Sequence, residues 1–281
     1  IGSDGTLGII SELELELMPA PAVIWGVSCF FARENQAVEA TVAARGRLRH
    51  AAALEYFDPA ALDILRRARA AGSAFSALPE LPASFGCCLF VEIQAPSEDE
   101  AMADVARLAS VVEAAGGSPC DSWVARTAVD RETLRFFRHA VPESVNMLID
   151  ERRRTEPTIT KLGSDMSVPD ERLADVIALY RSTLAEAGLE SVAWGHIGNN
   201  HLHVNILPRC REEFLRGKEL FERWARAVTE MGGAVSAEHG VGKIKRSFLA
   251  VMYGEEALAL VSQLRPDVLL TELMLPKLDG L

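Results

Sequence analysis

Three of the six histidines lie close together, at His196, His201 and His203. A strand beginning at His201 would place His201, His203 and Asn205 on one face, because side chains two residues apart in a strand point to the same side. The intervening Leu202 and Val204 would face the core. This alternation predicts a polar face on which several nitrogen ligands are presented together.

A second polar group, Glu238-His239, follows later in the chain. If the loop at His196 folds back onto the strand, His196, His203 and Glu238 can share one ion. Two imidazoles and one carboxylate leave coordination positions open on a divalent metal, as a catalytic site requires. His239 could then act as a general base, because its ordinary pKa lies near neutral pH.

The residues alone leave more than one function open. The same ligands would serve a metal-dependent hydrolase in which His239 activates water. They would also serve an inactive fragment that only holds metal. Nucleotide binding has no support, because Gly240-Val241-Gly242-Lys243 lacks the spacer and the Ser or Thr of a phosphate-binding loop. His50 and His139 are interpreted as ordinary structural histidines.

Composition excludes several classes of protein. The 281-residue chain has a formal net charge of −11, so a general affinity for nucleic acid or anionic lipid is not expected. No apolar run approaches the roughly 20 residues that span a bilayer. The five cysteines show no CxxC spacing, which favours reduced thiols in a cytoplasmic protein. The chain begins with Ile1, without a signal peptide, and is expected to be an internal piece of a longer protein.

Around these motifs, hydrophobic patterning predicts short strands that alternate with helices. Asp58-Pro59 and Ser97-Glu98-Asp99-Glu100 mark helix starts. The order predicts an α+β fold whose mainly antiparallel sheet is covered by helices. Strands are expected at 9–17, 25–31, 51–57, 87–93, 192–194 and 201–207, and helices at 35–48, 60–71, 97–115, 131–139, 169–187 and 212–231.

The two histidine motifs resemble the C-terminal region of the FAD-linked oxidases related to D-lactate dehydrogenase, glycolate oxidase and D-2-hydroxyglutarate dehydrogenase. The family patterns are roughly GHxGDGNxHxN and SAEHGxG. Asn199, Asn200 and His201 depart from the first pattern, where the family often has Asp-Gly-Asn. The matching residues are Gly195, His196, Gly198, His203 and Asn205, followed by Ser236, Ala237, Glu238, His239, Gly240 and Gly242.

The first ten residues, IGSDGTLGII, resemble the signature GSEGTLGIIT that closes the flavin-binding domain of this family. The resemblance implies that residues 1–20 are the end of an FAD-binding domain whose larger part is missing. Residues 21–264 would be the substrate and metal domain, and 265–281 an atypical tail resembling a response-regulator segment. The implied FAD contacts are Gly2, Ser3, Gly5, Thr6, Gly8 and Ile9.

The resemblance also implies the roles of the site residues. His196, His203 and Glu238 would bind a divalent metal, for which zinc is expected and manganese or iron are alternatives. His239 would take the proton of the substrate hydroxyl. Arg138, Lys161 and Asn205 would contact the substrate, the first two through its carboxylate.

The implied activity is FAD-dependent oxidation of a small 2-hydroxyacid to a 2-oxoacid, and the chain by itself is expected to be inactive. The implied fold is the ferredoxin-like substrate domain of vanillyl-alcohol-oxidase-type flavoproteins. A homodimer and a peripheral position at the inner face of the membrane are left open, and the electron acceptor is not identified.

Overall fold

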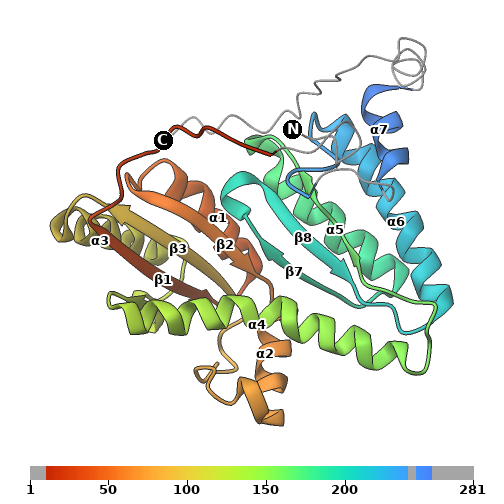
Figure 1. Cartoon of the computed structure of the whole chain (residues 1–281), viewed down its shortest axis with the longest axis horizontal. Coiled ribbons are helices and arrows are strands. Elements are labelled where there is room, and N and C mark those ends of the chain that lie inside the picture. The colour runs from red at the N-terminus through yellow and green to blue at the C-terminus, as the bar shows by residue number, and fades with distance from the viewer. Residues whose placement is uncertain (1–10, 240–244, 255–281) are drawn as a thin grey trace.

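The computed structural model describes residues 11–239 and 245–254. Its centre is an eight-stranded sheet in which all neighbouring strands are antiparallel (Figure 1). The strand order is β4-β1-β3-β2-β7-β8-β5, with β6 also paired to β8. The strands are β1 (Val23–Phe31), β2 (Ala51–Phe57), β3 (Cys87–Ala95), β4 (Trp123–Ala125), β5 (Leu162–Gly163), β6 (Met166–Ser167), β7 (Ser191–Gly195) and β8 (His201–Ile206).

Seven helices accompany the sheet within the described residues, so the predicted α+β class is confirmed. Helices begin where the sequence places capping groups: the Asp58 carboxylate accepts the N–H of Ala61, and the Ser97 hydroxyl accepts that of Glu100. The helices are α1 (Glu34–Arg45), α2 (Pro59–Ala71), α3 (Glu98–Ala114), α4 (Ala128–Arg153), α5 (Leu173–Ala187), α6 (Arg211–Glu230) and α7 (Arg246–Tyr253).

The first half of the chain has the ferredoxin-like arrangement. Strands β1 to β4 lie in the order β4-β1-β3-β2, and α1 and α3 connect and cover them. Helix α2 is inserted between β2 and β3. The second half extends the same sheet, because β7 pairs with β2 at Tyr56 and Phe57. One continuous sheet therefore joins the two halves.

Apolar side chains form a core on each face of the sheet. One core lies under α1, α3, α5 and α6 and contains the buried Tyr56 and Trp224. The other lies under α2 and α4 and contains Phe57 and Phe137. Adjacent residues Tyr56 and Phe57 enter opposite cores, as the alternation of a strand requires. Helix α4 runs along the sheet past both halves (Figure 1).

Two expected elements differ from the structure. The helix expected at 131–139 is α4, which continues through Pro142 to Arg153. The loss of one backbone hydrogen bond at the proline is outweighed by burial of Val141, Val145 and Ile149 against the sheet.

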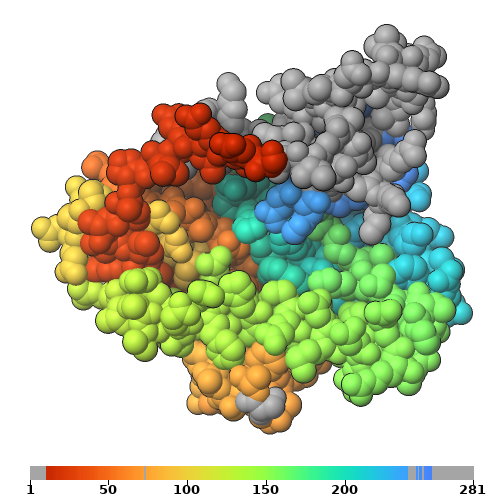
Figure 2. Space-filling model, viewed as in Figure 1, coloured from red at the N-terminus to blue at the C-terminus, as the bar shows by residue number. Residues whose placement is uncertain are grey.

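The strand expected at 9–17 is also wrong over the residues that the structure describes. Residues 11–20 pair with no described strand. Leu13, Leu15 and Leu17 are exposed, and this segment lies along the outer surface (red in Figure 2). Alternation alone cannot supply the neighbouring strand that backbone hydrogen bonding requires.

Several expectations lie outside the described residues, namely the FAD contacts Gly2, Ser3, Gly5, Thr6, Gly8 and Ile9 and the tail 265–281. None of the described helices is both long enough and apolar enough to cross a membrane.

Candidate metal and catalytic site

A tight turn between β7 and β8 brings His196 back toward His203. Gly195 has a φ of +127°, and a Cβ built on it would lie 2.9 Å from the Cδ2 atom of His203. Only glycine combines that conformation with that approach. The turn thus brings the two imidazoles together edge to face, with ring centroids 5.6 Å apart.

Asn200 closes the same turn in the left-handed conformation, with φ 53°. This is the position where the resemblance led us to expect glycine, and asparagine is among the few other residues that tolerate this conformation. Its side chain is fixed on two sides, since Oδ1 accepts from Arg45 and Nδ2 donates to Asp170 over 2.6 Å. The departure from the family pattern therefore preserves the turn.

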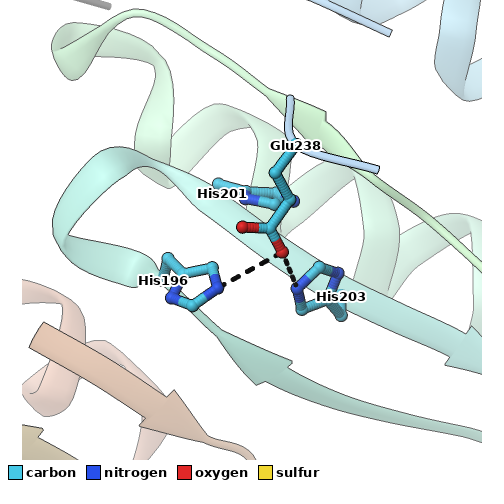
Figure 3. A group of neighbouring side chains, drawn as sticks. All are labelled: His196, His201, His203 and Glu238. Carbon is cyan, nitrogen blue, oxygen red and sulfur yellow. Dashed lines mark ion pairs between the residues drawn. The ribbon is translucent and has the colours of Figure 1, made fainter. Parts of the chain in front are cut away.

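Glu238 lies opposite this turn, in the segment that follows α6. Its Oε1 atom is 3.3 Å from Nε2 of His196 and 3.0 Å from Nε2 of His203 (Figure 3). The Nε2 atom of His239 is also 3.3 Å from this oxygen. Three imidazole nitrogens therefore converge on one carboxylate oxygen, so the structure brings His196, His203, Glu238 and His239 together.

The other ring nitrogens point away from this oxygen. Nδ1 of His196 lies 2.9 Å from Oε1 of Glu55, and Nδ1 of His203 lies 3.2 Å from the carbonyl oxygen of Ser164. Each Nδ1 must carry the proton, because both partners are acceptors. In the neutral rings each Nε2 then presents a lone pair toward Glu238.

Lone pairs that converge without a donor between them require added protons or a cation. Burial lowers the pKa of His203, which disfavours a proton there. The pKa of His196 is raised by its hydrogen bond to Glu55. Two nitrogens and one carboxylate oxygen are also a common donor set for zinc. The residues present therefore fit a divalent metal.

Asp165 holds the segment that carries Glu238 and His239. Its carboxylate accepts the backbone N–H of Glu238 at 3.2 Å and that of His239 at 3.1 Å. It also accepts from Ser236 at 2.9 Å and pairs with Lys245. Burial alone would raise its pKa, but hydrogen bonds from His201 and Lys245 outweigh that effect and hold the pKa well below its usual range.

His201 joins this arrangement from the strand. Its ring is buried, and its Nε2 lies 3.0 Å from Oδ1 of Asp165. One potential ligand atom on each of His196, His201, His203 and Glu238 lies within 4.8 Å of the others. The shared polar face predicted for His201 and His203 is present, but the pair with Asp165 directs His201 toward the segment that carries Glu238.

The residues assigned to the substrate are distributed differently. Nη2 of Arg138 lies 3.0 Å from Oε1 of Glu55, the oxygen that Nδ1 of His196 also contacts. Lys161 is half-buried beside β5, and burial lowers its pKa. Asn205 is buried and donates to the carbonyl of His203 at 3.0 Å. Asn205 therefore contacts the backbone of one converging histidine, whereas Arg138 shares the acceptor Glu55 with the ring of another.

A cavity of about 260 Å³ extends from Arg138 along the sheet. Arg131 and Arg135 from α4 also line it, together with Trp25 and Glu92 of the sheet. His139, interpreted above as structural, lies on its wall. The other such histidine, His50, pairs with Asp104 at 3.1 Å and belongs to no described group of potential metal ligands.

Sequence reasoning missed the two carboxylates that support the site. Asp165 lies in a short polar segment directly before β6, where no local pattern distinguishes it from a surface carboxylate. Glu55 was passed over, although one acidic residue facing inward from an apolar strand is unusual. That isolated charge in the segment AAALEYF is the signal that could have identified it.

The sequence matches the family described as FAD linked oxidases, C-terminal domain, over residues 20–266. It is 28% identical to a D-lactate dehydrogenase of Anaerostipes hadrus, covering 90% of this chain and 51% of that protein. It is 23% identical to glycolate oxidase subunit GlcD of Bacillus subtilis, covering 94% and 53%. A mitochondrial D-2-hydroxyglutarate dehydrogenase of Danio rerio is 26% identical, with coverage of 94% and 46%.

The chain therefore spans about half the length of these relatives. Among solved structures, an alkyldihydroxyacetonephosphate synthase superposes with a TM-score of 0.59 at 16% identity. The match covers 90% of this chain and 47% of that one. At this identity the likeness concerns the fold alone.

Proposed function

Because the chain belongs to the family of FAD linked oxidases, C-terminal domain, we propose that it is the substrate- and metal-binding part of an FAD-dependent 2-hydroxyacid dehydrogenase. The observation that carries this proposal is the convergence of His196, His203 and His239 on one oxygen of Glu238. The domain division at residues 20 and 264 and a cytoplasmic location belong to the same proposal.

His196, His203 and Glu238 would hold the metal. When bound, a divalent cation supplies positive charge that lowers the pKa of a hydroxyl group beside it. Zinc is the expected ion, since two imidazoles and a carboxylate form one of its usual open sites. Outward hydrogen bonds to Glu55 and to the Ser164 carbonyl fix both imidazoles in the tautomer that ligation requires.

His239 is suited to take the hydroxyl proton of the substrate. Its side chain is 65% exposed, so a small molecule can reach the ring, while its Nε2 stays 3.3 Å from Glu238. The proton passes from the hydroxyl oxygen to Nε2, and the carbon–oxygen bond gains double-bond character as hydride leaves the α-carbon. FAD, when bound in the preceding domain, supplies the acceptor for that hydride.

Arg138 would orient the substrate carboxylate. It lines the cavity with Arg131 and Arg135, so three guanidinium groups border the recess together with the carboxylates of Glu92 and Glu132. A guanidinium group binds a carboxylate through two parallel hydrogen bonds. Lys161 and Asn205 are proposed as further contacts.

The metal assignment can be tested on the chain itself. Wild type and His203→Ala are loaded with zinc, dialysed and analysed for bound metal, with His50→Ala as a matched control outside the site. We expect about one equivalent in wild type and control and little in His203→Ala. Equal metal content in all three proteins would show that the ligand set is wrong.

A further inference from the structure

Glu55 belongs to β2, in the first half of the sheet, yet its side chain reaches the converging histidines of the second half. It is 6% exposed. Its Oε1 atom lies 2.9 Å from Nδ1 of His196 and 3.0 Å from Nη2 of Arg138. One buried oxygen therefore contacts both a metal-ligand candidate and a substrate-binding candidate.

Glu55 is placed as a carboxylate between two donors, because its Oε1 accepts from Nη2 of Arg138 and from Nδ1 of His196. An anionic acceptor at Nδ1 makes the opposite nitrogen of an imidazole a stronger donor to a cation. His203 lacks this assistance, because its Nδ1 faces the neutral carbonyl of Ser164.

We propose that Glu55 is a positioning residue that strengthens metal binding at His196 and couples it to Arg138. The inference rests on the proposed function, since it requires that His196 bind a metal. Arg138 withdraws charge from the oxygen that His196 also uses, so the two contacts compete. An anion that neutralises Arg138 would strengthen the hydrogen bond between Glu55 and His196 and so raise the affinity for the metal. By thermodynamic linkage, bound metal would raise the affinity for the anion by the same factor.

The test measures the zinc dissociation constant by competition with a chromophoric chelator. In Glu55→Gln we expect zinc binding to weaken about 10- to 100-fold, as is usual when the outer partner of a ligand histidine is changed. Glu190→Gln is the matched control, because Glu190 also pairs with an arginine of α4, Arg152, but contacts no ligand candidate. The control should bind zinc as wild type does, because no ligand candidate loses a partner.

A second pair of variants measures the coupling. Arg138→Gln should bind zinc several-fold more tightly than wild type, and this gain should shrink in the double variant with Glu55→Gln. Visible spectra of the cobalt-loaded proteins report the ligand field, which a purely structural change distant from the metal would leave unaltered. Arg138→Gln also keeps the proposal testable if Glu55→Gln does not fold.

The outcomes separate this inference from the proposed function. If wild type binds no metal at all, the proposed function fails and this inference fails with it. If wild type binds zinc but Glu55→Gln binds equally well, only the role of Glu55 is refuted. Additive effects of the two substitutions would refute the coupling while leaving the role of Glu55 at His196 supported.

Discussion

Two buried aspartates, Asp104 in α3 and Asp165 between β5 and β6, have nearly the same surroundings. Asp104 accepts the backbone N–H groups of Arg49 and His50, pairs with Arg107 and lies 3.1 Å from the ring of His50. Asp165 accepts two backbone N–H groups, pairs with Lys245 and lies 3.0 Å from the ring of His201. Each therefore combines a carboxylate, a histidine, a cation and a fixed loop.

Their difference lies in what the fixed loop carries. The loop at Asp104 carries no further potential metal ligand, whereas the loop at Asp165 carries Glu238 and His239 next to His196 and His203. A buried histidine–aspartate pair is thus no evidence of catalysis by itself. What distinguishes the cluster at Asp165 is that additional potential metal ligands, His196 and His203, converge on the half-exposed Glu238.

The largest expected difference between the two clusters is in turnover. In the protein that includes the flavin domain, His239→Asn should lower the turnover number by roughly 10²–10⁴, since the general base is lost. His50→Asn is the control and should leave turnover unchanged, because His50 lies in the cluster without ligands. Metal content should stay the same in both. A His239→Asn enzyme with normal turnover would remove His239 from the mechanism.

The next difference is in metal affinity. Asp165→Asn places an amide N–H where the backbone N–H groups of Glu238 and His239 donate, so the loop should shift. We expect zinc binding to weaken about 10- to 100-fold, as for other changes behind a metal ligand. Asp104→Asn makes the same chemical change in the other cluster and should leave zinc binding unaltered. Equal effects of the two substitutions would contradict the distinction drawn between the clusters.

The elements of the fold were more predictable than either cluster. Strand 51–57 and helix 60–71 agree with β2 and α2 within a residue, because strand patterning and the cap at Asp58 are local signals. The histidine and glutamate motifs were also visible as residue types.

The contact between Glu55 and His196, in contrast, joins residues 141 apart in the sequence. It depends on β7 pairing with β2, and that pairing joins the two halves of the chain. The hydrogen bonds from the backbone of Glu238 and His239 to Asp165 likewise join a loop after α6 to a residue before β6. Local patterns determine elements, but they contain no information about which distant elements become neighbours.

The smallest expected difference is in stability. Asp104→Asn should lower the free energy of unfolding by about 1–3 kcal/mol at pH 7, because an NH₂ group replaces one of the two oxygens that accept from the backbone N–H groups of Arg49 and His50 and from the side chain of Arg107. Burial alone raises the pKa of Asp104, but hydrogen bonds from the backbone N–H of Arg49 and from the side chain of Arg107 outweigh it and lower the pKa in the folded state. A lowered pKa means that the folded state favours the charged form.

The contribution of the Asp104 charge to the free energy of unfolding is fully present above the pKa of an unfolded aspartate, about 3.9. It is lost as the pH falls through the lower folded pKa. The free energy of unfolding of Asp104→Asn should therefore lie below that of wild type by a constant amount from pH 7 to about 5, and this difference should shrink below about pH 4. Urea unfolding of both proteins across this range measures it. A deficit that stays constant down to pH 3 would mean that the charge of Asp104 does not stabilise the fold, and that shape or hydrogen-bond geometry alone makes this cluster structural.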